Sequence, residues 1–294
     1  MRWGDFRRSD NVEDVGRGGG GGFGAPVRLS GGAIIVAVIA SLLFGINPLD
    51  MLGGMMGAGP EVQAPAPSRS GQPPPASAPA PKGSQRDFVA AVLGSTEDVW
   101  KDVFSKMGSR YDPPKLATFE AAVQSACGRA STAAGPFYCP ADRKVYLDLA
   151  FFAELERRFK APGDFAQGYV IAHEVGHHVQ NLLGIMDQFA REQQRGDERS
   201  RNALSVRLEL QADCFAGIWG HYVQGLQKLD PGDLEEGLRA ASAVGDDTIQ
   251  KRTRGSVVPD AFTHGSAAQR VQWFRTGFDS GDLRACNTFN TRAP

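Results

Sequence analysis

His173, Glu174 and His177 form an HExxH pattern whose residue types and spacing suit metal-assisted hydrolysis. On an α-helix, residues four positions apart lie on one face about one turn apart, so both imidazoles can bind the same metal ion. The carboxylate beside them can take a proton from a water molecule on that ion. Because the pattern also occurs by chance, other parts of the chain must decide whether it is a metal site.

The residues around this pattern predict a buried helix. Asp164 is a good N-cap, and apolar residues recur at helical spacing through 165–182. Buried histidines need polar partners, and packing alone poorly explains two of them one turn apart. His178 is rotated about 100° from His177 around the helix, so we expect a polar or packing role for it instead of metal binding.

A hydrolytic zinc site usually has three protein ligands and one open position, so a third ligand should come from elsewhere in the chain. Segment 200–226 predicts a second helix with an apolar stripe, and Glu209 and Asp213 share one of its faces. Two carboxylates one turn apart repel each other unless a cation or a donor lies nearby. We therefore expect Glu209 to be the third zinc ligand and Asp213 to accept a hydrogen bond from a ligand histidine. The alternative is two solvated surface acids.

The chain contains HEVGHHVQ at 173–180, ELQAD at 209–213, GPFYCP at 135–140 and FTHGSAAQRVQWF at 262–274. This combination resembles the bacterial neutral zinc metallopeptidase family, the YpfJ-type proteins, over essentially the whole chain. The ELQAD segment also resembles that of the gluzincin metallopeptidases, in which the glutamate binds zinc.

The resemblance implies a zincin-like metallopeptidase domain that acts on a peptide or protein substrate. It supports His173, His177 and Glu209 as the ligands of one Zn²⁺ ion and Glu174 as the general base.

A candidate for stabilising the transition state lies further along the chain. An S-x-x-Q capping box at 266–269 predicts that another helix begins there. His264 lies just before that helix, where its ring N–H could donate to a tetrahedral oxyanion, so we name it as a catalytic candidate. His221 and Tyr222, on the second helix, are the alternatives.

The part of the chain before the metal helix predicts mixed structure, and the fold class we expect is α+β, predominantly α. Segment 87–107 predicts a helix, while 137–139 and 145–147 predict two short strands of a small antiparallel sheet. In zincin-like peptidases a strand before the metal helix offers its edge to an extended substrate. By that resemblance, 144–148 is our substrate-binding candidate, with an ordinary structural hairpin as the alternative.

The N-terminal third indicates membrane attachment. Residues 1–30 are polar and rich in glycine, which predicts a disordered cytoplasmic segment. Residues 31–52 are mostly apolar and predict a single transmembrane helix, with a buried core helix and a cleaved signal peptide as the alternatives. Residues 53–83 form a Gly/Pro/Ala-rich linker, and 84–294 are of ordinary size for one metallopeptidase domain.

The distribution of charge predicts the orientation in the membrane. Five arginines precede the apolar stretch, and no further Lys or Arg follows until Arg69. The positive-inside rule then predicts a single-pass protein of the bacterial inner membrane, with a cytoplasmic N-terminus and a periplasmic or extracytoplasmic catalytic domain. A net charge of −1 and the lack of a basic stripe give no sign of nucleic-acid binding. The sequence does not determine the oligomeric state.

The four cysteines agree with an oxidising compartment, because their even number allows complete pairing. We expect Cys127–Cys139, which closes a short loop, and by elimination Cys214–Cys286. A thiolate zinc ligand is the alternative for Cys214, although that residue lies about 140° from Glu209 around the helix.

Taken together, these features predict a membrane-anchored zinc metalloendopeptidase. A catalytically silent, zinc-stabilised binding or scaffold protein of the envelope is one alternative. A zinc amidase that acts on cell-wall peptide is another, because the same zinc chemistry serves either amide bond.

Overall fold

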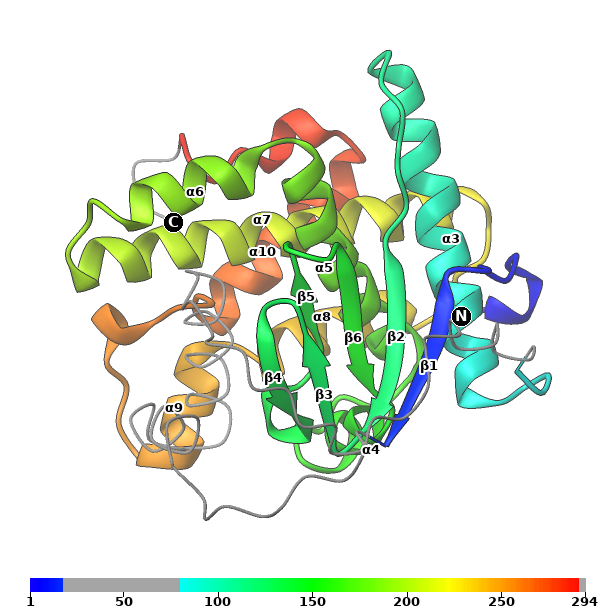
Figure 1. The fold of residues 1–294 in the computed structure, drawn as a ribbon, viewed down its shortest axis with the longest axis horizontal. Helices are drawn as coiled ribbons and strands as arrows, with labels where there is room; N and C mark the ends of the chain where they lie inside the picture. The colour runs from blue at the N-terminus through cyan, green and yellow to red at the C-terminus, as the bar shows by residue number, and fades with distance from the viewer. Residues whose placement is uncertain (18–79, 291–294) are drawn as a thin grey trace, which may run out of the picture.

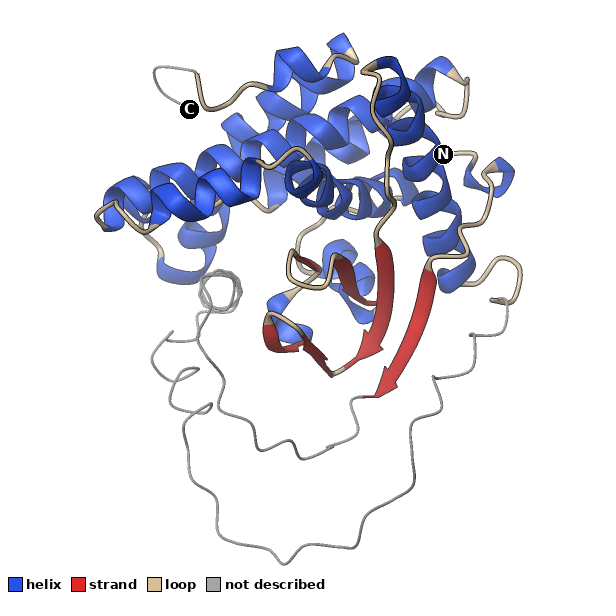
Figure 2. Cartoon of the chain, turned by 45° about the horizontal axis from the view of Figure 1, so that its top comes forward, coloured by secondary structure: helices blue, strands red, loops and turns tan. Residues whose placement is uncertain are grey.

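The computed structural model describes residues 1–17 and 80–290 of the 294-residue chain. In this part a layer of helices packs beside a small sheet (Figures 1 and 2). The predicted transmembrane helix at 31–52 and nearly all of the predicted linker at 53–83 lie outside the described residues. Among the helices of 1–17 and 80–290, none combines the length and the apolar character that a bilayer crossing requires.

The larger sheet has the strand order β1-β2-β6-β5 and is mostly parallel. Its strands are β1 (Val12–Arg17), β2 (Lys115–Glu120), β6 (Lys144–Asp148) and β5 (Phe137–Cys139). Only β5 runs antiparallel to its neighbour, and a separate antiparallel hairpin joins β3 (Ala122–Ser125) to β4 (Gly128–Ser131). The predicted antiparallel pairing of 137–139 with 145–147 is confirmed by β5 and β6. The expectation of an antiparallel sheet is wrong for the other two pairings, β1 with β2 and β2 with β6, which are parallel. Parallel neighbours need a crossover connection, and α3 (Gln85–Lys106) lies on the one between β1 and β2.

Strand β6 lies inside the sheet and has no free edge. Lys115 to Phe119 of β2 pair with one side of it, and β5 pairs with the other. The expectation that 144–148 offers an edge to substrate is therefore wrong, because β2 occupies that edge. Within the described strands the sheet ends at β5, which packs beside the metal-motif helix.

Residues 1–17 belong to the same fold as residues 80–290, so the expectation of a disordered segment at 1–30 is wrong for this part. Strand β1 pairs along its length with β2. The Arg8 guanidinium bonds the Asp87 carboxylate at 2.7 and 2.9 Å, at the start of α3. The α-ammonium of Met1 lies 2.8 Å from Asp164 and 3.0 Å from Asp233. The segment is polar because its charges have partners on the helices, which a hydropathy argument does not detect.

This pairing bears on the predicted membrane orientation. Backbone hydrogen bonds between two strands cannot form across a bilayer. A cytoplasmic residue 1 together with an external catalytic domain would separate β1 from β2, and so does not fit the sheet. Residues 1–17 and 80–290 belong on the same side of any membrane.

Cysteine labelling in intact cells tests this arrangement. Asp10 and Val257 are exposed, Val257 at 42%, so cysteines placed there should leave the fold unchanged. We expect the Asp10→Cys and Val257→Cys variants to respond alike to a membrane-impermeant maleimide, with both labelled or both protected. Detergent-treated cells give the full-labelling control. Labelling of one position with protection of the other would contradict the pairing of β1 with β2 in the cell.

The helical layer is built around α5 (Asp164–Leu182), α7 (Glu198–Gly225) and α10 (Ala267–Ser280). Besides α3, the other α-helices of the described residues are α4 (Ala150–Arg157), α6 (Ile185–Gln193), α8 (Asp233–Ala243) and α9 (Asp246–Arg254). Glycines let the central helices approach closely: a Cβ on Gly176 would lie 3.0 Å from the Ala212 carbonyl oxygen, and one on Gly277 only 1.8 Å from that of Cys214. The first of these contacts brings the HExxH helix against the helix that carries Glu209.

Both predicted disulfides, Cys127–Cys139 and Cys214–Cys286, are present. The first ties the β3–β4 hairpin to β5, and the second ties α7 to the C-terminal segment. No cysteine is free, so the alternative of a Cys214 thiolate ligand is excluded.

Candidate metal centre

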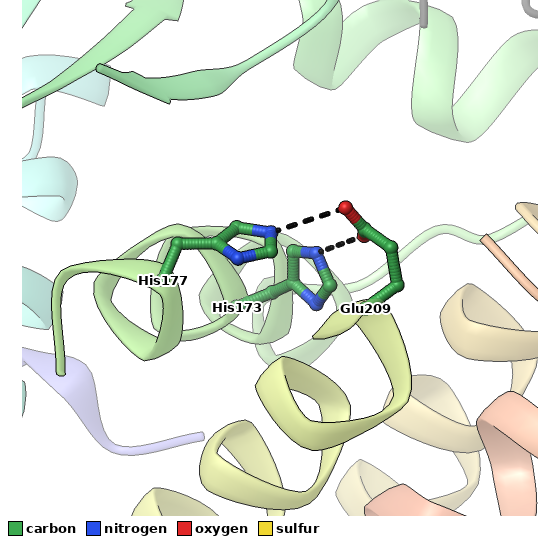
Figure 3. Close-up of side chains that lie close together, drawn as sticks. All are labelled: His173, His177 and Glu209. Atoms are coloured by element: carbon green, nitrogen blue, oxygen red, sulfur yellow. Dashed lines mark hydrogen bonds and ion pairs between the residues drawn. The ribbon is translucent and has the colours of Figure 1, made fainter. Parts of the chain in front are cut away.

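The side chains of His173, His177 and Glu209 converge between α5 and α7 (Figure 3). His173 Nε2 lies 3.1 Å from one carboxylate oxygen of Glu209, and His177 Nε2 lies 3.5 Å from the other. All three residues are less than 10% exposed. The two helices therefore bring together the three residues that the sequence singles out as metal ligands.

This donor set fits a zinc ion. Ligand atoms bound tetrahedrally at about 2.1 Å from one zinc ion lie roughly 3.4 Å apart, close to the separations seen here. Two imidazole nitrogens and one carboxylate are a ligand set of catalytic zinc, which leaves the fourth position for water or substrate. The residues present can hold the ion with little rearrangement.

The electrostatics of the cluster favour a bound cation. Burial alone would raise the pKa of Glu209, but the neighbouring His177 and His173 lower it well below its usual value. Burial works against a charged imidazole, yet hydrogen bonds to Asp213 and Glu209 outweigh it and raise the pKa of His173 to about 10. The buried carboxylates therefore remain ionised and stabilise positive charge beside them.

Asp213 lies where the sequence places it, against a ligand histidine. Its Oδ1 atom is 3.0 Å from Nδ1 of His173 and is completely buried. Because Nδ1 donates its proton to this carboxylate, Nε2 is the nitrogen that faces Glu209 and would bind a metal ion once its own proton is released.

Arg270 and Tyr169 hold Asp213 in turn, and the sequence analysis missed both. Nε and Nη2 of Arg270 donate to the two carboxylate oxygens at 2.8 and 2.9 Å, and the Tyr169 hydroxyl donates at 2.5 Å. Burial alone would raise the pKa of Asp213, but the Arg270 charge and the bond from His173 lower it. The sequence did contain one signal for a buried Arg270. This residue lies one turn before Phe274, on the apolar face of the helix that follows the capping box.

Glu174 is buried at 8% exposure beside the cluster. Burial and the nearby Glu209 raise its pKa, and the charges of His173 and His177 only partly oppose them. A carboxylate whose pKa is moved toward neutrality can both accept and return a proton near pH 7.

His264 lies within electrostatic range of the cluster, because the charge of Glu209 contributes to its pKa. Burial lowers this pKa, but Asp246 outweighs burial and raises it. Oδ1 of Asp246 lies 3.2 Å from Nδ1 of His264, and its other oxygen accepts three backbone N–H bonds from 263–265. The sequence analysis singled out His264 but missed Asp246, the group that orients it.

The alternatives to His264 have other partners. His221 Nδ1 bonds the Phe278 carbonyl oxygen at 2.7 Å, and the Tyr222 ring packs under the Lys106 ammonium. His178 bonds the Tyr138 hydroxyl and the Asp112 carbonyl oxygen, in agreement with the packing role expected for it.

A second acidic group, Asp164, Asp233 and Glu236, also gathers within the described residues. The α-ammonium of Met1 lies among these carboxylates, within 3.0 Å of Asp164 and Asp233. This group offers oxygen atoms alone, so it is a poorer match to zinc than the cluster of two histidines and Glu209.

Comparison with known proteins finds a family whose description names zinc. The family described as "Putative neutral zinc metallopeptidase" matches residues 1–289. The chain is 46% identical over 295 residues to YpfJ of Escherichia coli K12, a match that covers 98% of this chain and 99% of the relative. It is 43% identical over 213 residues to Rv2575 of Mycobacterium tuberculosis H37Rv, covering 69% and 70%. No solved structure matches the chain.

Proposed function

Since the chain belongs to the neutral zinc metallopeptidase family, we propose that it hydrolyses peptide bonds at the cluster of His173, His177 and Glu209. The observation that carries this proposal is the position of Glu174. It lies buried beside three convergent ligands, yet it is not one of them. A purely structural zinc site has no use for such a carboxylate.

His173, His177 and Glu209 would hold the zinc ion. When bound, zinc lowers the pKa of a water molecule and polarises the carbonyl group under attack. Asp213 orients His173 and, through Arg270, connects the ligand to α10.

Glu174 acts as general base and then as general acid. It takes a proton from the attacking water and passes it to the amine that leaves when the peptide C–N bond breaks. The raised pKa of Glu174 suits this double role, because the same carboxyl group must hold the proton between the two steps.

His264 donates a hydrogen bond to the oxyanion that develops on the substrate carbonyl. Asp246 accepts from Nδ1, so the other ring N–H is left for the substrate. The raised pKa of His264 favours the form in which both ring nitrogens carry a proton and can donate.

We place the substrate along β5, in an extended conformation. Within the described strands this is the end of the sheet nearest α5, and the Tyr138 hydroxyl connects the two elements by accepting from Asn181. Main-chain bonds to a sheet edge give affinity for a peptide of any sequence.

The two disulfides favour an extracytoplasmic location for the domain. Attachment to the membrane through 31–52 stays a prediction. It is compatible with the fold only where residues 1–17 and 80–290 share one compartment.

Removal and return of zinc tests the proposal. We expect protein treated with a chelator to lose turnover of a mixed peptide library, and one equivalent of Zn²⁺ to restore it. Zinc-loaded protein that binds peptides without cleaving them would favour the binding-protein alternative. Cleavage confined to cell-wall peptides would favour the amidase.

A further inference from the structure

The two histidines of the cluster have different outer partners. His173 is held by the charged Asp213, whereas Nδ1 of His177 lies 2.9 Å from Oε1 of Gln180. Gln180 is completely buried and follows His177 by one turn of α5. A neutral amide therefore faces Nδ1 of His177, whereas a carboxylate faces Nδ1 of His173.

The hydrogen bonds of Gln180 determine which way its amide points. Its Nε2 donates to the Leu208 carbonyl oxygen at 2.7 Å and to Oε1 of Gln211 at 3.1 Å. Both N–H groups of the Gln180 amide are thus used. If the amide were reversed, its oxygen would face the Leu208 carbonyl oxygen and Oε1 of Gln211, which are both acceptors. Oε1 must accept from His177, so Nδ1 of that ring carries a proton, and Nε2, which faces Glu209, is the nitrogen left to bind zinc.

The amide nitrogen of Gln211 also has a hydrogen-bond partner. Its Nε2 donates to the Cys286 carbonyl oxygen at 3.0 Å, and the disulfide ties Cys286 to Cys214 on the same helix as Gln211. Two buried amides therefore connect a predicted zinc ligand on α5, across α7, to the C-terminal segment.

Charge explains why an amide suits this position. The Asp213 carboxylate is balanced by Arg270. Among the described residues, the side-chain hydrogen bonds of Gln180 go to His177, Leu208 and Gln211, and none goes to a lysine or an arginine. A carboxylate here would be a buried charge without a partner, and both amide donors would be lost.

We propose that Gln180 is a positioning residue that fixes His177 as the Nδ1–H tautomer for zinc binding, and that Gln211 and the Cys286 carbonyl group fix Gln180. The proposal rests on the zinc site described above. Partners of metal-ligating histidines contribute about 10- to 100-fold to metal affinity.

The zinc Kd, measured by competition with a fluorescent chelator, tests this role without any assay of activity. We expect Gln180→Met, which keeps the length of the side chain, to weaken zinc binding by about 10- to 100-fold. Gln211→Met should weaken it less, because Gln180 keeps its bond to Leu208. The matched control is Gln188→Met on α6, an exposed position where the Kd should not change.

A second measurement uses the wild-type protein, so it does not depend on the folding of a variant. Nitrogen-15 NMR of the zinc-loaded protein should show a slowly exchanging Nδ1–H on His177. A proton on Nε2, or a wild-type Kd in folded Gln180→Met, would overturn the role of Gln180 while leaving the zinc site intact. A wild-type protein that binds no zinc would overturn the proposed function as well.

Discussion

The Glu174→Gln variant is expected to bind zinc like the wild type and to lose about 10²- to 10⁴-fold in kcat, the usual contribution of a general acid–base residue. The carboxamide has nearly the same shape but cannot take the proton of the attacking water. Zinc binding should persist because the three ligands converge without Glu174. Metal content and the rate of peptide cleavage, measured on the same preparation, separate the two effects.

The matched control for this variant is Glu235→Gln on α8, an exposed carboxylate far from the ligand set in sequence. It should retain both zinc and activity. Full turnover by Glu174→Gln would remove Glu174 from the chemistry. Loss of zinc would instead show that Glu174 helps to build the site.

The Arg270→Met variant is expected to lose about 3–5 kcal/mol of unfolding free energy, the usual cost of breaking a buried ion pair. Arg270 is 4% exposed and donates to both oxygens of Asp213, which is itself completely buried. Without Arg270 the buried Asp213 carboxylate keeps its charge and loses the cation that bonds both of its oxygens, so that only His173 and Tyr169 still face one of them. Denaturant unfolding of metal-free protein measures the effect apart from any change in zinc affinity.

Two further variants test the cause of that loss. Arg275→Met removes an exposed arginine from the same helix and should change stability by less than about 0.5 kcal/mol. Adding Asp213→Asn to Arg270→Met should recover part of the stability, because the unpaired charge is gone. Equal losses in Arg270→Met and Arg275→Met would contradict the importance of the buried pair.

The local part of the site could be predicted from the sequence because helical spacing determines it. His173 and His177 share a face whenever their segment is helical, and Glu209 and Asp213 do so for the same reason. The family resemblance, confirmed by the match over residues 1–289, connected the two helices. The disulfide pairing followed from a short loop and elimination.

The partners contributed by distant segments could not be predicted in this way. Arg270 and Asp246 reach the site from α10 and α9, and the spacing within one helix does not reveal which neighbours its face will meet. Gln180 was visible in the motif, but its role depends on Gln211 and the Cys286 carbonyl oxygen across α7.

The sheet was the weakest part of the sequence analysis. Strand β1 comes from a polar segment that is separated from its partner by more than 90 residues, and β2 alternates too weakly to stand out. Parallel pairing over such a distance leaves little local signal, unlike a hairpin with its turn. The errors on strand 144–148 and on the N-terminal segment both follow from missing these two strands.

Anomalous diffraction on either side of the zinc absorption edge is the most direct test of the central claim. The account predicts one zinc peak, placed between Nε2 of His173, Nε2 of His177 and the carboxylate of Glu209. No peak there, or a peak only among Asp164, Asp233 and Glu236, would contradict it.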